Sequence, residues 1–229
     1  MSHRRRGADA FGARHRLRWN EAPSKGRHAT RDGEASPSID WISTLRAKRN
    51  ARLDARHLRY RRARGDAAVL HCFLLDCSGS MLAGDRLARA KGMLVALFDR
   101  AYRERAEIAL VCFGGGRAQV RRQPGAAHWF NERWVMPIGG GGGTPLALGL
   151  ASASTVLERA ARRRPSQRRW LWLLTDGRTN ERPQAPLAAH EIVVVDFETD
   201  AIRVGRAEAL ARDWGARHVT ADALSEDAV

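Results

Sequence analysis

The sequence predicts an α/β fold with a doubly wound, mostly parallel sheet that carries helices on both faces. Apolar runs of strand length at residues 69–75 and 170–174 show no polar alternation, which is typical of strands buried on both faces. Residues 86–104 repeat apolar side chains at spacings of three and four, which predicts an amphipathic helix. Strands that alternate with helices imply right-handed crossovers and parallel pairing.

The other elements follow from the same two periodicities. The expected strands are residues 69–75, 108–113, 118–122, 170–174, 192–195 and 218–219. The expected helices are residues 86–104, 145–162 and 205–214, with a short helix or turn at 129–135. Glycines 114–116 form a turn that returns residues 118–122 as a hairpin partner, and residues 139–143 form a glycine loop. Pro145 suits the first turn of the helix that follows, where its missing N–H is no loss.

The positive charge is concentrated in the first part of the chain. The 229 residues carry a net charge of +15, of which residues 1–64 hold +12, with 18 basic and 6 acidic residues. Residues 1–38 contain few large apolar side chains, so we expect a basic, disordered arm. Residues 39–66 are expected to be a basic connecting segment with a short ordered piece near Trp41.

The cysteine pattern and the hydropathy favour a reducing, cytoplasmic compartment. Three cysteines without a CxxC pair make a disulfide framework or a zinc site improbable. No stretch approaches the roughly 20 apolar residues of a membrane span, and the basic start is not followed by a signal-peptide core. We therefore expect a cytoplasmic protein that does not bind membranes.

Polar residues with metal-binding chemistry follow the predicted strand ends. Residues 76–80, Asp-Cys-Ser-Gly-Ser, follow the first strand, and Thr175-Asp176-Gly177 follows the 170–174 strand, while Thr144 ends the glycine loop. Sites in such sheets form at the loops that leave the carboxyl ends of strands. The predicted metal ligands are Asp76, Ser78, Ser80, Thr144 and Asp176.

This set of oxygen atoms suits a hard cation, Mg²⁺ or alternatively Mn²⁺. Ser78 and Ser80 are two residues apart in an expected extended turn, so both hydroxyls can face one ion, and Thr144 can add a third oxygen. Asp76 and Asp176 can bind directly or through water. If they act mostly through water, the ion stays electropositive and favours a carboxylate from a partner. Each pattern alone also fits an ordinary turn or flexible loop.

These residues match the metal-ion-dependent adhesion site of von Willebrand factor A (VWA) domains. More closely, the chain resembles the C-terminal VWA portion of magnesium chelatase D subunits over roughly residues 40–225. The matching stretches are residues 74–81, 90–92, 108–113, 142–146, 174–180 and 195–199. The resemblance implies a VWA domain at residues 67–225 with a Rossmann-like sheet.

The resemblance also implies a role in an ATP-driven metal chelatase that inserts magnesium or cobalt into a tetrapyrrole, the latter for cobalamin synthesis. The chain would be a non-catalytic subunit that couples an AAA-type ATPase to the large chelatase subunit. Family D subunits usually carry an AAA-like domain and an acidic, proline-rich linker, and this sequence shows neither, so we expect a short stand-alone version. Residues 139–144 lack the lysine of a phosphate loop, so no ATP site is expected.

Three other functions remain open from the residues alone. The chain could serve an unrelated AAA ATPase as a VWA adaptor. The basic arm could bind nucleic acid through phosphate attraction, although no base-stacking motif supports it. A phosphatase would need an aspartate where Ser78 stands, and no GxSxG motif indicates a serine hydrolase. His71, Trp170 and Trp172 are interpreted as core residues, and Trp129 and Trp134 as partly exposed.

Overall fold

A computed structural model describes residues 41–49, 52–58, 69–127, 135–136, 138–200 and 204–228. The expected basic arm at residues 1–38 lies outside these ranges, as do Trp129 and Trp134. Within the expected connecting segment, residues Trp41–Lys48 form helix α1 and residues Ala55–His57 form the short 3₁₀ helix η1. The ordered piece expected near Trp41 is therefore helical.

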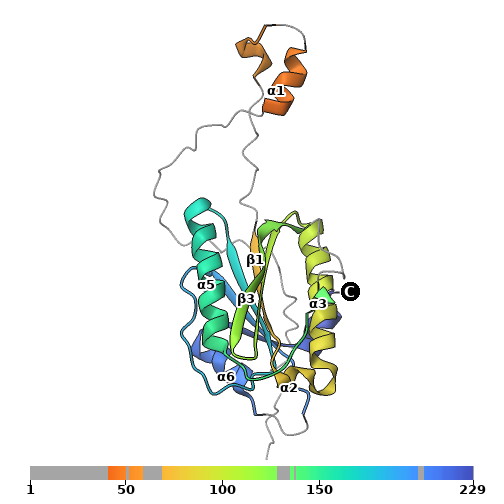
Figure 1. Cartoon of the computed structure of the whole chain (residues 1–229), viewed down its shortest axis with the longest axis vertical. Helices are drawn as coiled ribbons and strands as arrows, with labels where there is room; N and C mark the ends of the chain where they lie inside the picture. Colours follow the sequence, from red (N-terminus) through yellow and green to blue (C-terminus); the bar gives the residue numbers. More distant parts are fainter. Residues whose placement is uncertain are drawn as a thin grey trace, which may run out of the picture. The chain divides into compact units, whose positions relative to one another are not determined.

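Six strands form one sheet in the order β3-β2-β1-β4-β5-β6 (Figure 1). The strands are β1 (Leu70–Asp76), β2 (Glu107–Gly114), β3 (Arg117–Ala126), β4 (Arg169–Thr175), β5 (Glu191–Asp196) and β6 (Arg217–Thr220). β3 pairs with β2 in the antiparallel sense, and every other neighbouring pair is parallel. The predicted hairpin and the predicted, mostly parallel sheet are both confirmed.

Helices cover both faces of this sheet. They are α2 (Gly79–Leu82), η2 (Ala83–Asp85), α3 (Arg86–Arg103), α5 (Leu146–Arg163), α6 (Arg206–Asp213) and α7 (Ala221–Ala228). Helices α5 and α6 enclose one apolar cluster with the sheet, while α3 and α7 contact each other and the strands. Figure 1 shows α5 and α3 on opposite sides of the strands. The predicted doubly wound α/β class is confirmed.

Burial explains why the apolar runs form strands. Every residue of β1 and β4 is buried, because both are central strands with helices above and below. β3 instead alternates exposed and half-buried residues along most of its length, as an edge strand does. In α3 the apolar residues at spacings of three and four, Leu87 through Ala101, are all buried.

The aromatic residues of β1 and β4 form part of the core, as predicted. His71 is fully buried, and its Nδ1 accepts a hydrogen bond from Trp172 Nε1 at 3.1 Å. The rings of Trp170 and Trp172 stack with centroids 5.7 Å apart. Burial, together with the charge of Arg100, lowers the pKa of His71 to about 3. The histidine is therefore a neutral core residue.

The structure differs from the prediction after β1. The expected extended turn ends at Ser78, which has extended backbone angles, and helix α2 begins at Gly79. Serine at the residue before a helix is a favoured arrangement. Ser80 therefore lies in the first turn of α2. Among the described helices, none is long and apolar enough to cross a membrane.

Candidate metal-ion site

The candidate site lies between β1 and β4, where the order in which the chain adds strands to the sheet reverses. The chain moves outward from β1 through β2 to β3, whereas β4, β5 and β6 extend on the other side of β1. Asp76 is the last residue of β1, and Asp176 directly follows β4. Crevices at this point of a parallel sheet are the usual ligand sites of doubly wound folds.

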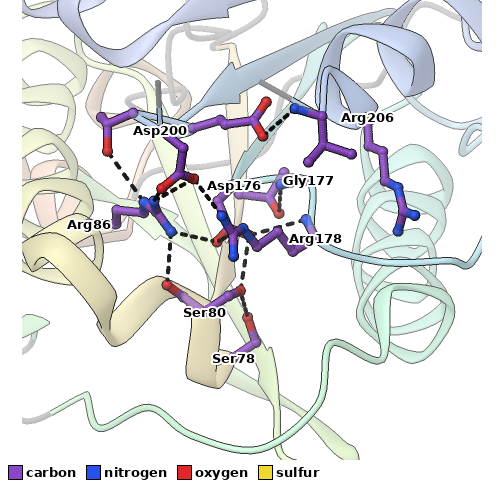
Figure 2. Close-up of polar contacts among 12 residues, drawn as sticks. Ser78, Ser80, Arg86, Asp176, Gly177, Arg178, Asp200 and Arg206 are labelled. Atoms are coloured by element: carbon purple, nitrogen blue, oxygen red, sulfur yellow. Dashed lines mark hydrogen bonds and ion pairs between the residues drawn. The ribbon is translucent and has the colours of Figure 1, made fainter. Parts of the chain in front are cut away.

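Four of the five predicted ligands form one hydrogen-bonded chain. The Oγ atoms of Ser78 and Ser80 lie 3.1 Å apart, and Ser80 Oγ donates to Asp176 Oδ1 at 3.1 Å (Figure 2). Asp76 Oδ1 accepts from the backbone N–H of Ser78 at 2.9 Å. Asp76, Ser78 and Asp176 are buried, while Ser80 is half-buried. Two carboxylates and two hydroxyls thus converge on one edge of the sheet.

The glycine loop is docked against the loop after β1 through backbone atoms. The N–H of Gly79 donates to the carbonyl of Gly142 at 2.8 Å, and the N–H of Gly141 donates to the carbonyl of Cys77 at 2.8 Å. Gly142 has φ +72°, and a Cβ there would lie 2.6 Å from Gly115 Cα. Only glycine fits such a position without displacing backbone. Gly142 therefore allows the two loops to pack closely.

Thr144, the fifth predicted ligand, is positioned by this loop. Its carbonyl accepts from the N–H of Leu146 at 2.9 Å and from Thr179 Oγ1 at 3.4 Å. Within the described ranges, its hydroxyl has no hydrogen bond to the other four predicted ligands. Thr144 therefore stands beside the hydrogen-bonded chain and is not a member of it.

Thr175 orients Asp76, a contact that sequence analysis did not single out. Its hydroxyl donates to Asp76 Oδ2 at 2.7 Å and accepts from the N–H of Gly177 at 3.0 Å. Burial raises the pKa of Asp76 above its usual range, and the Asp176 carboxylate adds to the rise. Hydrogen bonds from Thr175 and Ser78 oppose it.

An ionic group that the sequence did not predict surrounds Asp176. Arg86 is buried and contacts both Asp176 and Asp200, and Arg178 contacts the same two carboxylates. One signal could have indicated Arg86: it is the first residue of α3, where a positive charge opposes the helix dipole. A cation at that position has an unfavourable local environment unless a carboxylate neutralises it.

The side chains present fit a hard divalent cation. The donors are all oxygen atoms, which Mg²⁺ prefers. Across the described ranges, no three His, Cys, Asp or Glu side chains gather in a metal-binding group, so a cation here would depend on hydroxyl and water oxygens as well. Asp76 and Asp176 also raise a charge problem, because two buried carboxylates lie close enough to disturb one another. A cation would relieve it.

The fold and this arrangement define a class. Residues 72–178 match the model of the von Willebrand factor type A domain. The crystal structure of the conserved hypothetical protein BatB from Bacteroides thetaiotaomicron matches with a TM-score of 0.52 and 17% identity, over 70% of this chain and 99% of that one. The fold is therefore von Willebrand factor A-like, and residues 72–178 are similar to that domain family.

The chain is also similar to magnesium-chelatase subunits, as the sequence predicts. It is 37% identical to the magnesium-chelatase 60 kDa subunit of Rhodobacter capsulatus, over 54% of this chain and 21% of that subunit. It is 34% identical to the 67 kDa subunit of Chlorobaculum parvum, over 58% and 20%. An uncharacterized protein of Mycobacterium tuberculosis is 34% identical over 71% and 28%. The chain thus spans under a third of the length of these relatives.

Proposed function

We propose that the chain is a Mg²⁺-dependent protein-docking subunit of an ATP-driven metal chelatase system. The observation that carries this proposal is the hydrogen-bonded chain from Ser78 through Ser80 to Asp176, with Asp76 beside it at the same sheet edge. Similarity to magnesium-chelatase subunits supports the chelatase setting.

In this proposal each residue has a defined part. Ser78, Ser80 and Thr144 contribute hydroxyl oxygens, while Asp76 and Asp176 contribute carboxylates directly or through water. Thr175 keeps Asp76 oriented through its 2.7 Å hydrogen bond. When bound, Mg²⁺, or Mn²⁺ in its place, would supply an open coordination position for a carboxylate of a partner protein.

The partners follow from the chelatase setting. We propose an AAA-type ATPase subunit and the large chelatase subunit, with ATP hydrolysis on the ATPase driving insertion of magnesium or cobalt into a tetrapyrrole. The chain itself is then non-catalytic. Cys72, Cys77 and Cys112 are all free thiols, which supports a reducing cytoplasm as the compartment.

The first prediction concerns capture of these partners. The full chain is immobilised, incubated with source-cell lysate in Mg²⁺ or in EDTA, and the captured proteins are identified by mass spectrometry. We expect an AAA-type ATPase or a large chelatase subunit with Mg²⁺ only. Ser78→Ala should abolish this capture in Mg²⁺, because it removes an oxygen from the site but leaves the core intact.

The serine variant is the decisive arm of this experiment. EDTA also strips metal from ATPases, whereas Ser78→Ala alters only the bait. Ser152→Ala, in α5 and away from the site, is the matched control and should capture as the unchanged chain does. If the Ser78→Ala bait retains full capture, whether in Mg²⁺ or in EDTA, the docking proposal is wrong. Capture dominated by nucleic acid that washes off in salt would instead favour the basic arm as the functional part.

A further inference from the structure

Arg86 is a buried cation beside the candidate metal ligands, and its side chain is only 4% exposed. Its Nη1 donates to the Ser80 carbonyl at 3.2 Å and to Asp176 Oδ2 at 3.4 Å. Its Nη2 lies 2.7 Å from both carboxylate oxygens of Asp200, and its Nε lies 3.5 Å from Thr199 Oγ1. Figure 2 shows this guanidinium between the two aspartates.

The two aspartates do not share Arg86 equally. Asp200 is the closer partner by 0.7 Å, because its oxygen lies 2.7 Å from the guanidinium and that of Asp176 lies 3.4 Å away. Asp200 also accepts from Arg178, whose Nε lies farther away from Asp176, at 3.9 Å. The hydrogen bond from Arg178, helped by the charge of Arg86, holds the pKa of Asp200 below its usual range. Asp200 therefore stays ionised and draws both guanidinium groups toward itself.

The closer pairing of both arginines with Asp200 affects how available the Asp176 carboxylate is to a metal ion. A guanidinium that pairs closely with Asp176 would compete with a metal ion for the same carboxylate, because like charges repel strongly where water is excluded. Asp176 Oδ1 instead accepts from the Ser80 hydroxyl and from the N–H of Arg178. Only Oδ2 faces Arg86 and the Arg178 side chain.

We propose that Asp200 and Arg86 are positioning residues that set the metal affinity of the site from outside its ligands. Asp200 holds Arg86 and Arg178 off Asp176, which leaves the Asp176 carboxylate available to a cation. Asp200 belongs to the segment between β5 and α6, and its side chain is 35% exposed. Any partner group that draws Asp200 away from the arginines would therefore weaken metal binding. The inference rests on the proposed metal-dependent function.

Two substitutions should move the affinity in opposite directions. Asp200→Asn removes the charge that restrains the arginines, so both can shift toward Asp176, and the Kd for Mg²⁺ should rise about tenfold, as is usual for residues behind metal ligands. Arg86→Gln removes the competing charge, so the Kd should fall about threefold or more by the same reasoning. In the double variant the rise caused by Asp200→Asn should shrink, because it acts mainly through Arg86.

The test is isothermal titration calorimetry of Mg²⁺ into the full chain and each variant. Arg86→Lys keeps the charge and should stay near the Kd of the unchanged chain. Asp222→Asn, which breaks the exposed Arg89–Asp222 pair at the same helix, is the matched control and should leave the Kd unchanged. Circular dichroism melts check that each variant is folded.

The outcomes separate two failures. If the unchanged chain binds no Mg²⁺, the proposed function itself fails. If the unchanged chain binds Mg²⁺ but folded Asp200→Asn binds equally well, or Asp200→Asn and Arg86→Gln both weaken binding, the positioning proposal is overturned and the arginine cluster is only structural. Should Arg86→Gln not fold, the Kd of Asp200→Asn against that of Asp222→Asn decides.

Discussion

Two buried carboxylates at the sheet edge have different surroundings. Asp76 accepts from neutral donors, the Thr175 hydroxyl and the Ser78 amide, at 2.7 and 2.9 Å. Asp176 lies 3.4 Å from a cation, Arg86, in addition to its contact with Ser80. The position of Asp76 is thus fixed by groups that carry no net charge, whereas the electrostatics at Asp176 depend on how a neighbouring ion pair is arranged.

The close contact at Gly142 predicts how a substitution there changes the free energy of unfolding. Gly142→Ala should lower the free energy of unfolding by about 2 kcal/mol or more, because the residue has φ +72° and the new Cβ would meet Gly115 Cα at 2.6 Å. Urea unfolding followed by circular dichroism measures the change. Gly139→Ala is the control, since no atom of the residues that the structure describes lies within 4 Å of its added Cβ, and it should change stability by under about 0.5 kcal/mol. Equal losses in both would refute close packing as the reason for glycine at 142.

Some residues of the candidate site could be predicted from the sequence, and others could not. Asp76, Ser78, Ser80 and Asp176 could be brought together because each follows an apolar run, and parallel strands end at a common edge. The ion pair between Arg86 and Asp200 could not be predicted from the sequence. The two residues are 114 positions apart, and no spacing rule links the start of a helix to the loop after β5. Charge pairs of this kind depend on side-chain packing.

At the scale of elements, periodicity predicted all six strands and helices α3, α5 and α6, but not helices α2 and α7. The central strands β1 and β4 were predictable because burial on both faces requires an unbroken apolar run. Helix α2 has four residues, too few to show a helical period. Length does not explain why α7 was not predicted, because α6 also has eight residues. Ser78 directly precedes α2, and the N–H of its first residue, Gly79, donates to the carbonyl of Gly142. This helix therefore depends on a contact from a distant segment, which local periodicity does not reveal.

The core histidine of β1 predicts a dependence of stability on pH. The pKa of His71 is lowered to about 3 in the folded chain, so between pH 6.5 and 3 the unfolded chain binds a proton that the folded chain does not. Stability should therefore fall as the pH drops through this window, by about 1.4 kcal/mol per pH unit from this residue. Urea unfolding at a series of pH values measures the slope.

His71→Asn is the informative variant. Its amide oxygen can still accept from Trp172 Nε1, and it does not titrate, so the slope below pH 6.5 should flatten even if overall stability falls. His57→Asn in η1, outside the sheet, should leave the slope unchanged. An unaltered slope in His71→Asn would show that acid sensitivity comes from other groups.

At the scale of the whole chain, charge separates two regions. Residues 1–64 carry +12, and residues 65–229, with 22 basic and 19 acidic residues, carry only +3. The candidate metal ligands all belong to the nearly neutral region. We propose that residues 1–38 dock on an acidic surface of the ATPase partner, since complementary charge speeds association and is screened by salt.

Deletion of residues 1–38 tests this role. The shortened chain should still capture its partner in a Mg²⁺-dependent manner, because the candidate ligands are retained. It should capture less at low salt and lose less capture between about 50 and 300 mM NaCl, because fewer charges are left to screen. Capture assays over a salt series provide the measurement. Unchanged capture with unchanged salt dependence would exclude a docking role for the arm.

The glycine loop limits which side chains near the candidate site a partner protein could contact. Around the candidate site, the flank formed by residues 139–143 offers only main-chain atoms, much the same for any sequence, and most of these glycines are exposed. The other flank carries the exposed side chains of Arg178 and Asp200, which are 43% and 35% exposed. Discrimination between partner proteins would therefore depend on the side-chain flank. Because Asp200 is also proposed to set the metal affinity, a change of partner preference there would be coupled to a change in metal binding.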